Sequence, residues 1–196
     1  FNPLALINVG TDMWYQSADI YSNYAALKRS DLAPGARPLG VWGQVYWGRD
    51  KYGDTDAQSV FGSDIDINER VNTEKWGIQG GVDYNFGGGV IGATAGWQKA
   101  KSDLGGSIAE IDGKGWNAGL YAIFRSATGF YGGILAKYDR NKLEIINPGF
   151  AGLGKLDSRS VGIEGEIGYR MPMGSSTLDL GGGLAWVRTK HDDFSF

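Results

Sequence analysis

The chain has 196 residues, with 33 Gly, 25 aromatic residues (seven Trp, ten Tyr and eight Phe), no Cys and a formal net charge of -3. The lack of cysteine excludes disulfides and thiolate metal sites, and without a basic stripe the charge argues against a nucleic-acid partner. No apolar run approaches the roughly 18 residues of a membrane-spanning helix, although a membrane strand needs only about ten residues of alternating pattern.

The first predicted element is a helix over residues 4–29, LALINVGTDMWYQSADIYSNYAALKR. At about 1.5 Å per residue it would span roughly 39 Å, close to the thickness of a bilayer with headgroups. It is too polar to lie in lipid, and Pro34 and Pro38 end it. Its broad apolar face holds Leu6, Ile7, Met13, Trp14, Ile20, Tyr21, Tyr24 and Leu27. Its opposite face holds Asn8, Asp12, Gln16, Asp19 and Asn23.

The rest of the chain alternates as strands do. In NTEKWGIQGGVDYNF, residues 72–86, polar side chains occupy one parity and Trp, Ile, Val, Tyr and Phe occupy the other. We expect strands near 39–52, 71–86, 89–101, 114–126, 129–143, 158–171 and 177–189. Long polar loops, 53–70, 102–113 and 144–157, alternate with tight turns at FGGGV, RSATGF and MPMGSST. This asymmetry is typical of an up-and-down outer-membrane barrel.

The aromatic residues of one parity cluster at both strand ends. Trp47, Trp76, Trp97, Trp116, Tyr138 and Trp186 fall at the long-loop ends, and Tyr84, Phe86, Phe124, Phe130 and Tyr169 fall at the short-turn ends. Two aromatic girdles around an apolar band indicate a surface that faces lipid. A soluble barrel or sandwich is the alternative, but it would give no reason for this segregation.

The other parity predicts a polar inner wall. Its members are Gln44, Lys75, Gln79, Asp83, Thr94, Gln98, Asn117, Arg125, Lys137, Asp139, Glu164, Glu166, Arg170 and Asp179. Because both signs of charge are present, a hydrogen-bonding wall around a helix is favoured over an ion-selective pore. The fold class is therefore all-β, an up-and-down antiparallel transmembrane β-barrel with about seven strands here, preceded by a helix. Asn8, Asp12, Gln16, Asp19 and Asn23 of that helix could pair with the wall.

Three other segments invite a chemical interpretation. HDD, residues 191–193, places the one His beside two Asp, but no second acid pair is spaced to activate water. DIDINE, residues 64–69, lacks the glycine and the twelfth-position glutamate of a calcium loop and is expected to be a solvated acidic loop. FGGGV lacks the helix that a phosphate-binding loop needs. We expect no catalytic residue, no cofactor and no metal.

The layout resembles the C-terminal translocator domain of the classical autotransporters, the type V secretion proteins of Gram-negative bacteria. The matching stretches are NVGTDMWYQSADIYSN, GVWGQVYWG, KWGIQGGVDYNFGGGVIGATAGWQKAKSD, GWNAGLYAIFRSATGFYGGILAKYDRN and RSVGIEGEIGYRMPM. In that family a helix threads a twelve-stranded barrel and joins it to an N-terminal passenger. The final amphipathic strand of the family is not recognisable here, so the resemblance implies a barrel that lacks about five C-terminal strands. Asn8 and Asn23 lack the paired motif of autocleaving families, so autocleavage is not expected.

The resemblance implies a domain organisation and a function. Residues 1–38 would be a linker helix in the barrel lumen, and residues 39–196 would be strands of an outer-membrane barrel. The expected function is non-enzymatic: a translocator and anchor for a surface-displayed passenger, with outer-membrane lipid, the passenger and the barrel-assembly machinery as partners. A self-contained porin or adhesin is the alternative, followed by an outer-membrane hydrolase.

Overall fold

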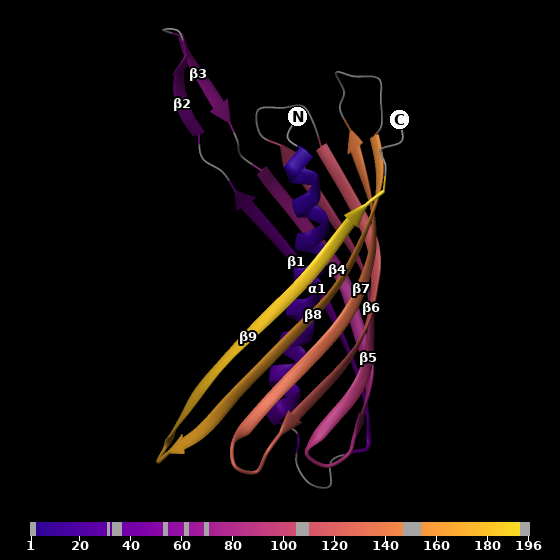
Figure 1. Cartoon of the computed structure of the whole chain (residues 1–196), viewed down its shortest axis with the longest axis vertical. Helices are drawn as coiled ribbons and strands as arrows, with labels where there is room; N and C mark the ends of the chain where they lie inside the picture. The colour runs from indigo at the N-terminus through magenta and orange to yellow at the C-terminus, as the bar shows by residue number, and fades with distance from the viewer. Residues whose placement is uncertain are drawn as a thin grey trace.

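The computed structural model describes residues 3–30, 32, 37–52, 55–60, 63–68, 71–104, 110–146 and 154–192. Its main elements are one long helix and one curved antiparallel sheet of seven strands. The helix is α1 (Pro3–Ser30). The strands of the sheet are β1 (Leu39–Tyr52), β4 (Val71–Asn85), β5 (Gly89–Leu104), β6 (Glu110–Arg125), β7 (Phe130–Ile146), β8 (Gly154–Met173) and β9 (Ser176–His191). The sheet curves around α1, which lies along its inner face (Figure 1).

The helix extends one residue beyond the predicted bounds at each end, so the expected span over residues 4–29 is confirmed. Its last turn carries Lys28 and Arg29, whose positive charges interact favourably with the negative end of the helix dipole. Within the part of the chain that the structure describes, no helix is both long enough and apolar enough to cross a membrane.

The sheet is an up-and-down meander, because its order β1-β4-β5-β6-β7-β8-β9 follows the chain and every neighbouring pair is antiparallel. The seven predicted strands are confirmed. The expected loop over 53–70 is wrong, since β2 (Thr55–Val60) and β3 (Ser63–Asn68) form a separate two-stranded hairpin within it. The DIDINE segment therefore lies largely in a strand, and its alternation of Ile with Asp is the period of two that a strand requires.

Three tight connections lie at one end of the sheet, at residues 86–88, 126–129 and 174–175. Glycines at 87, 88, 129 and 174 adopt positive φ there, a conformation that other residues rarely take. At the opposite end the strands run further than the sequence predicts, for example to Leu104 in β5 and from Glu110 in β6. Ion pairs Lys99–Asp112 (3.0 Å) and Lys101–Glu110 (3.0 Å) join β5 to β6 in this extension, which explains why a polar segment continues the ladder.

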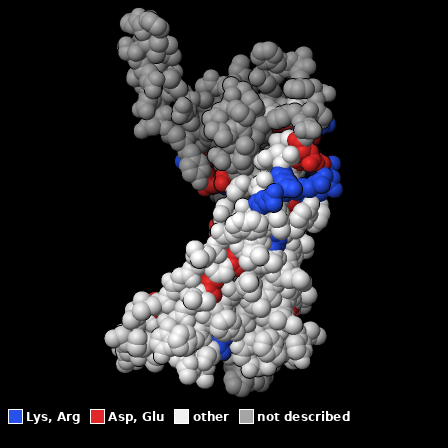
Figure 2. All heavy atoms as spheres, viewed as in Figure 1, with Lys and Arg blue, Asp and Glu red and all other residues white. Residues whose placement is uncertain are grey.

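The outer face of the sheet carries both predicted aromatic girdles. All six aromatics of the long-connection girdle are exposed, from Trp97 at 37% to Trp47 at 70%. Trp76 and Trp97 pack edge to face with ring centroids 4.8 Å apart, and Phe130 and Tyr169 do so at 4.7 Å in the second girdle. Figure 2 shows only scattered charged side chains over most of the strands and a denser group of Lys and Arg toward the long-connection end.

Two apolar clusters fill the space between α1 and the sheet. One joins Trp14, Ala18, Tyr21 and Ala25 of the helix to inward residues of β5, β6 and β7. The other joins Val9 and Met13 to Ala100, Ile111, Leu143, Ile145 and Leu156 near the long-connection end. The inner face is therefore less uniformly polar than the sequence predicts, because its polar side chains lie among apolar ones.

Candidate functional site

The interface between α1 and the inner face of the sheet holds several buried polar side chains, among them Ser17, Asp83 and Lys137. One ridge of the helix makes it, formed by Trp14, Ser17, Ala18, Tyr21 and Ala25 at spacings of three, four and seven residues. All five are at most 3% exposed. Small residues between the aromatics bring the helix close to the sheet.

Gly162 on β8 makes room for the deepest side chain of this ridge. A Cβ at Gly162 would lie 2.5 Å from Cζ2 of Trp14, a separation that real Cβ atoms do not show. The Trp14 indole Nε1 donates a hydrogen bond to the Lys137 carbonyl (3.5 Å), so the ring has both an apolar seat and a polar partner. The glycine on β8 therefore allows the helix to pack closely against the sheet at Trp14.

Lys137 on β7 is a buried cation, 2% exposed, whose ammonium donates three hydrogen bonds. Its Nζ contacts Asp139 (2.7 Å), the Ser17 hydroxyl (2.5 Å) and the Trp14 carbonyl (3.0 Å). It also lies 4.7 Å from the centroid of the Trp14 ring. Because an ammonium has three donors, the site satisfies them completely and joins α1 to β7.

Asp83 on β4 is the matching buried anion toward the short-turn end. It accepts hydrogen bonds from Tyr24 and from Tyr121 (3.3 Å), and the Lys28 ammonium lies 3.2 Å away. The Tyr24 ring stacks on Trp42 with centroids 4.3 Å apart, and Trp42 donates to the Tyr121 hydroxyl (2.9 Å). Two helix residues are thereby held on β1, β4 and β6 together.

The last turns of α1 reach the remaining strands through carboxylates of β8. Ser22 donates to Glu164 (2.6 Å), and Arg29 pairs with Glu166. Arg125 donates to the Arg29 carbonyl (3.2 Å), which gives a partner to one of the carbonyls that a helix end leaves open. Arg29 also lies over the Tyr131 ring at 4.6 Å.

A second layer of polar contacts runs between the strands. Gln79 donates to Thr94 (2.7 Å) and to Asn117 (2.9 Å), linking β4, β5 and β6. Gln98 donates to Asp139 (3.1 Å), which connects this layer to the Lys137 site. These side chains are at most 4% exposed, so the layer is part of the interior.

Not every residue of the predicted wall joins this interface. Lys75 is buried and pairs with Asp50 (2.7 Å), whereas Gln44 on β1 is exposed. Asp179 on β9 is also exposed and accepts from Tyr131 (2.6 Å) and Arg170 (2.7 Å). Gln44 and Asp179 lie on the two edge strands, where no further strand covers them in the described sheet.

The predicted polar face of the helix makes none of the hydrogen bonds described above, although Asp12 and Asp19 lie close enough to Lys75 of the wall for their charges to interact. Asp12 and Gln16 are half-buried, Asp19 and Asn23 are exposed, and the side chain of Asn8 lies outside the described residues. The wall is instead contacted by Thr11, Trp14, Ser17, Tyr21, Ser22, Tyr24, Lys28 and Arg29. A stripe of Ser and Ala between Trp14 and Ala25 was the sequence signal for this ridge.

The remaining candidate segments show no chemical constellation. His191 is half-buried at the end of β9, and Asp192 accepts from Arg159 (2.9 Å) instead of from His191. Asp193 and the side chains of residues 64–69 lie outside the described residues. The FGGGV segment is a tight turn between β4 and β5, as expected. The polar and aromatic contacts described above thus form a binding surface for α1 on the inner face of the sheet.

Comparisons with known proteins agree with this architecture. The family model described as "Autotransporter beta-domain" matches residues 41–195. The translocator domain of the autotransporter NalP from Neisseria meningitidis is 16% identical, with a TM-score of 0.64 over 93% of this chain and 61% of that one. The beta domain of the Bordetella autotransporter BrkA is also 16% identical, with a TM-score of 0.58 over 79% of this chain and 59% of that one. The chain thus spans about three fifths of each, and no curated protein matches it.

Proposed function

We propose that this chain, which belongs to the autotransporter β-domain family, anchors and exports an N-terminal passenger. The family is one of outer-membrane translocator barrels of Gram-negative bacteria, which gives the chain its location and general role. The passenger, its export through the barrel and the help of the barrel-assembly machinery are our proposals. So is the organisation in which residues 1–38 are a linker in the lumen and residues 39–196 supply barrel strands.

The observation that carries the proposal is the packing of α1 along the inner face of the sheet. Trp14 is fully buried, and partly buried ion pairs join the helix to β4 and β8. A linker that connects an external passenger to a strand beginning in the periplasm must cross the barrel, and a seated helix of 28 residues does so. Its polar contacts give partners to inward groups that would otherwise face an empty channel.

This arrangement disfavours the porin alternative. Lys137 and Asp83, which would line a conducting pathway, are instead bonded to Ser17, Tyr24 and Lys28 of the helix. We also propose that the domain itself is not an enzyme, since the buried polar side chains described above either hold α1 or join neighbouring strands.

Surface display of the passenger tests the function. An epitope inserted in the passenger of the full-length protein should be labelled by antibody on intact cells, and trypsin added outside should remove it. Gln44→Lys, on an exposed inward position, should leave labelling intact. A barrel that is folded and inserted, but whose passenger is labelled only after the outer membrane is opened, would refute export.

A further inference from the structure

Cations form a row on the outer face immediately beyond the long-connection girdle. Each of six strands carries one Lys or Arg at the outward position two residues beyond its girdle aromatic. On β8, Val161 takes the place of the girdle aromatic. The six cations are Arg49, Lys99, Lys114, Arg140, Arg159 and Arg188. On β4 the same place holds Glu74, which pairs with Arg49. The row lies where a bilayer places its headgroups, because amphipathic rings settle at that level.

Neighbouring strands bring like charges directly opposite one another in the middle of this row. Lys114 lies opposite Lys99 on β5 and opposite Lys142 on β7. Arg140 lies opposite Arg159 on β8. Like charges directly opposite in a sheet repel and destabilise it. We call Lys99, Lys114, Arg140, Lys142 and Arg159 the cationic patch.

Carboxylates neutralise only part of the patch. Lys99 pairs with Asp112 (3.0 Å), Arg140 with Asp157 (3.3 Å) and Arg159 with Asp192 (2.9 Å). Lys142 lies opposite Asp157 on β8, but that carboxylate is paired with Arg140. Neither Lys114 nor Lys142 has an ion pair with any of the residues that the structure describes, and both are exposed. The centre of the patch therefore has the charge and geometry to receive an anion from outside the chain.

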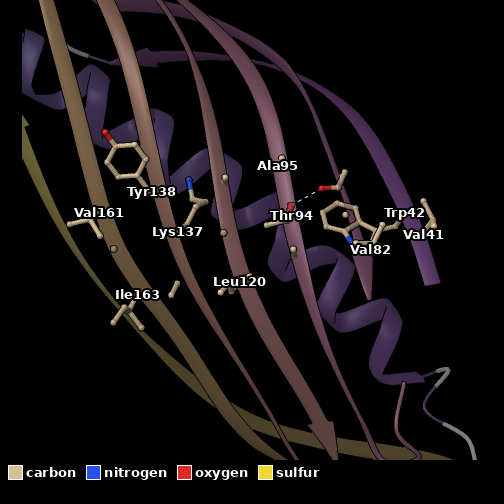
Figure 3. Close-up of a pocket in the computed structure, with 17 residues that line it drawn as sticks. Val41, Trp42, Val82, Thr94, Ala95, Leu120, Lys137, Tyr138, Val161 and Ile163 are labelled. Atoms are coloured by element: carbon tan, nitrogen blue, oxygen red, sulfur yellow. Dashed lines mark hydrogen bonds between the residues drawn. The ribbon is translucent and has the colours of Figure 1, made fainter. Parts of the chain in front are cut away.

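An apolar hollow lies directly below the patch on the same strands. It has a volume of about 950 Å³ and opens on the face of the sheet opposite to α1 (Figure 3). Its floor is made by the small residues Ala93, Ala95, Ala118 and Ala136, and larger side chains such as Leu120 and Ile163 stand around it. Along β5, β6 and β7 the outward sequence is thus a small residue, a girdle aromatic and a cation.

From these two features we infer that the patch and the hollow bind a phosphorylated lipid of the outer leaflet. The phosphates lie over Lys114 and Lys142, and acyl chains occupy the hollow between the girdle and the middle of the membrane. A lipid is favoured over a free anion because the hollow continues the patch into the apolar band. The inference rests on the outer-membrane placement with the long connections outside, but not on passenger export.

A binding titration with matched variants tests the inference. The folded full-length protein in neutral detergent is titrated with fluorescent hexa-acyl lipid A carrying two phosphates. Lys114→Gln with Lys142→Gln should raise the Kd about 30-fold, since each cation near a headgroup is worth about a factor of five. The control, Arg49→Gln with Lys51→Gln, removes the same charge at the same height on β1 and should change Kd less than twofold.

Two further arms separate the possible ligands and folding defects. Asp112→Asn should tighten binding several-fold, because it frees Lys99. Lipid A without phosphates should bind the unaltered protein about as weakly as it binds the Lys114/Lys142 variant. Equal losses in both double variants, or no dependence on phosphate, would overturn the inference, and so would competition by millimolar inorganic phosphate, which would indicate a free-anion site. Heat-modifiable migration and passenger display should remain normal in both double variants, so a failure of export would be seen separately.

Discussion

At the scale of residues, whether a strand position points outward or inward decides which substitutions it tolerates. Leu120 lies halfway between Trp116 and Phe124 on β6 and is 69% exposed. We expect Leu120→Lys to destabilise the barrel by roughly 2 to 4 kcal/mol, the cost of a lysine near the bilayer midplane. Gln44→Lys, inward and exposed, should cost little. Urea unfolding of the full-length barrel in lipid vesicles measures both, and equal losses would contradict the facing.

Inward positions differ in how well they tolerate substitution. This difference cannot be predicted from the alternation of the sequence alone. Gln79 and Gln44 are opposite each other in the β1–β4 register and belong to the same predicted wall. Gln79 is fully buried and donates to Thr94 and Asn117, whereas Gln44 on the edge strand is exposed. The difference comes from neighbouring strands and from α1, so it depends on contacts between residues far apart in the sequence.

The buried pair Lys137–Asp139 gives a second prediction at this scale. Removing the cation alone leaves Asp139 buried with only neutral partners, Gln98 and Ser17. We expect Lys137→Met to destabilise the seated helix by about 3 to 5 kcal/mol, because an uncompensated buried charge is costly. The double variant Lys137→Met with Asp139→Asn should recover much of that loss. Proteolysis of α1 in the folded barrel measures the effect, and a double variant no more stable than the single would contradict the pairing.

At the scale of elements, the helix is the part that the sequence predicts best in extent and least well in rotation. Its bounds were predicted within one residue, because the apolar pattern and the following prolines mark them. The residues that contact the sheet were predicted only in part, since Ser17, on neither predicted face, makes a buried contact. The predicted polar residues make no hydrogen bond to the described strands, although Asp12 and Asp19 lie near Lys75. Rotation follows from where the sheet offers space, as Gly162 does for Trp14.

For the strands as well, features set by neighbouring residues in the sequence were predicted, and features set by contacts between distant residues were not. Alternation placed all seven strands of the sheet, and tight turns followed from glycine-rich segments. The β2–β3 hairpin was missed because its acidic alternation was interpreted as a solvated loop. The longer start of β6 was missed because Asp112 and Glu110 are held there by cross-strand ion pairs to Lys99 and Lys101 of β5.

The proposal that α1 plugs the barrel can be tested by conductance. Deleting residues 4–29 from the full-length protein should raise single-channel conductance severalfold in planar bilayers, because the apolar and polar contacts that fill the inner face are removed. The barrel should still insert, which heat-modifiable migration would show. Unchanged conductance would place the helix outside the pore and favour a self-contained porin or adhesin.

At the scale of the whole molecule, the sheet described here has two free edges. β1 pairs with β4 and β9 pairs with β8, and no ladder joins β1 to β9 among the described residues. A spanning sheet in lipid needs partners for every backbone group, since each unpaired group in hydrocarbon costs several kcal/mol. The outer girdles nevertheless continue onto both edge strands through Trp47 and Trp186, so these edges lie at membrane height.

The last prediction follows from those edges. Residues 1–196 expressed alone and refolded in detergent should not give a protease-resistant, heat-modifiable monomer, because β1 and β9 would expose their outer hydrogen-bonding groups. The full-length protein, refolded in parallel, should give one. Electrophoresis with and without heating, followed by trypsin digestion, distinguishes the two outcomes. A compact monomer from residues 1–196 would mean that β1 and β9 close on each other, and that α1 fits within a seven-stranded barrel.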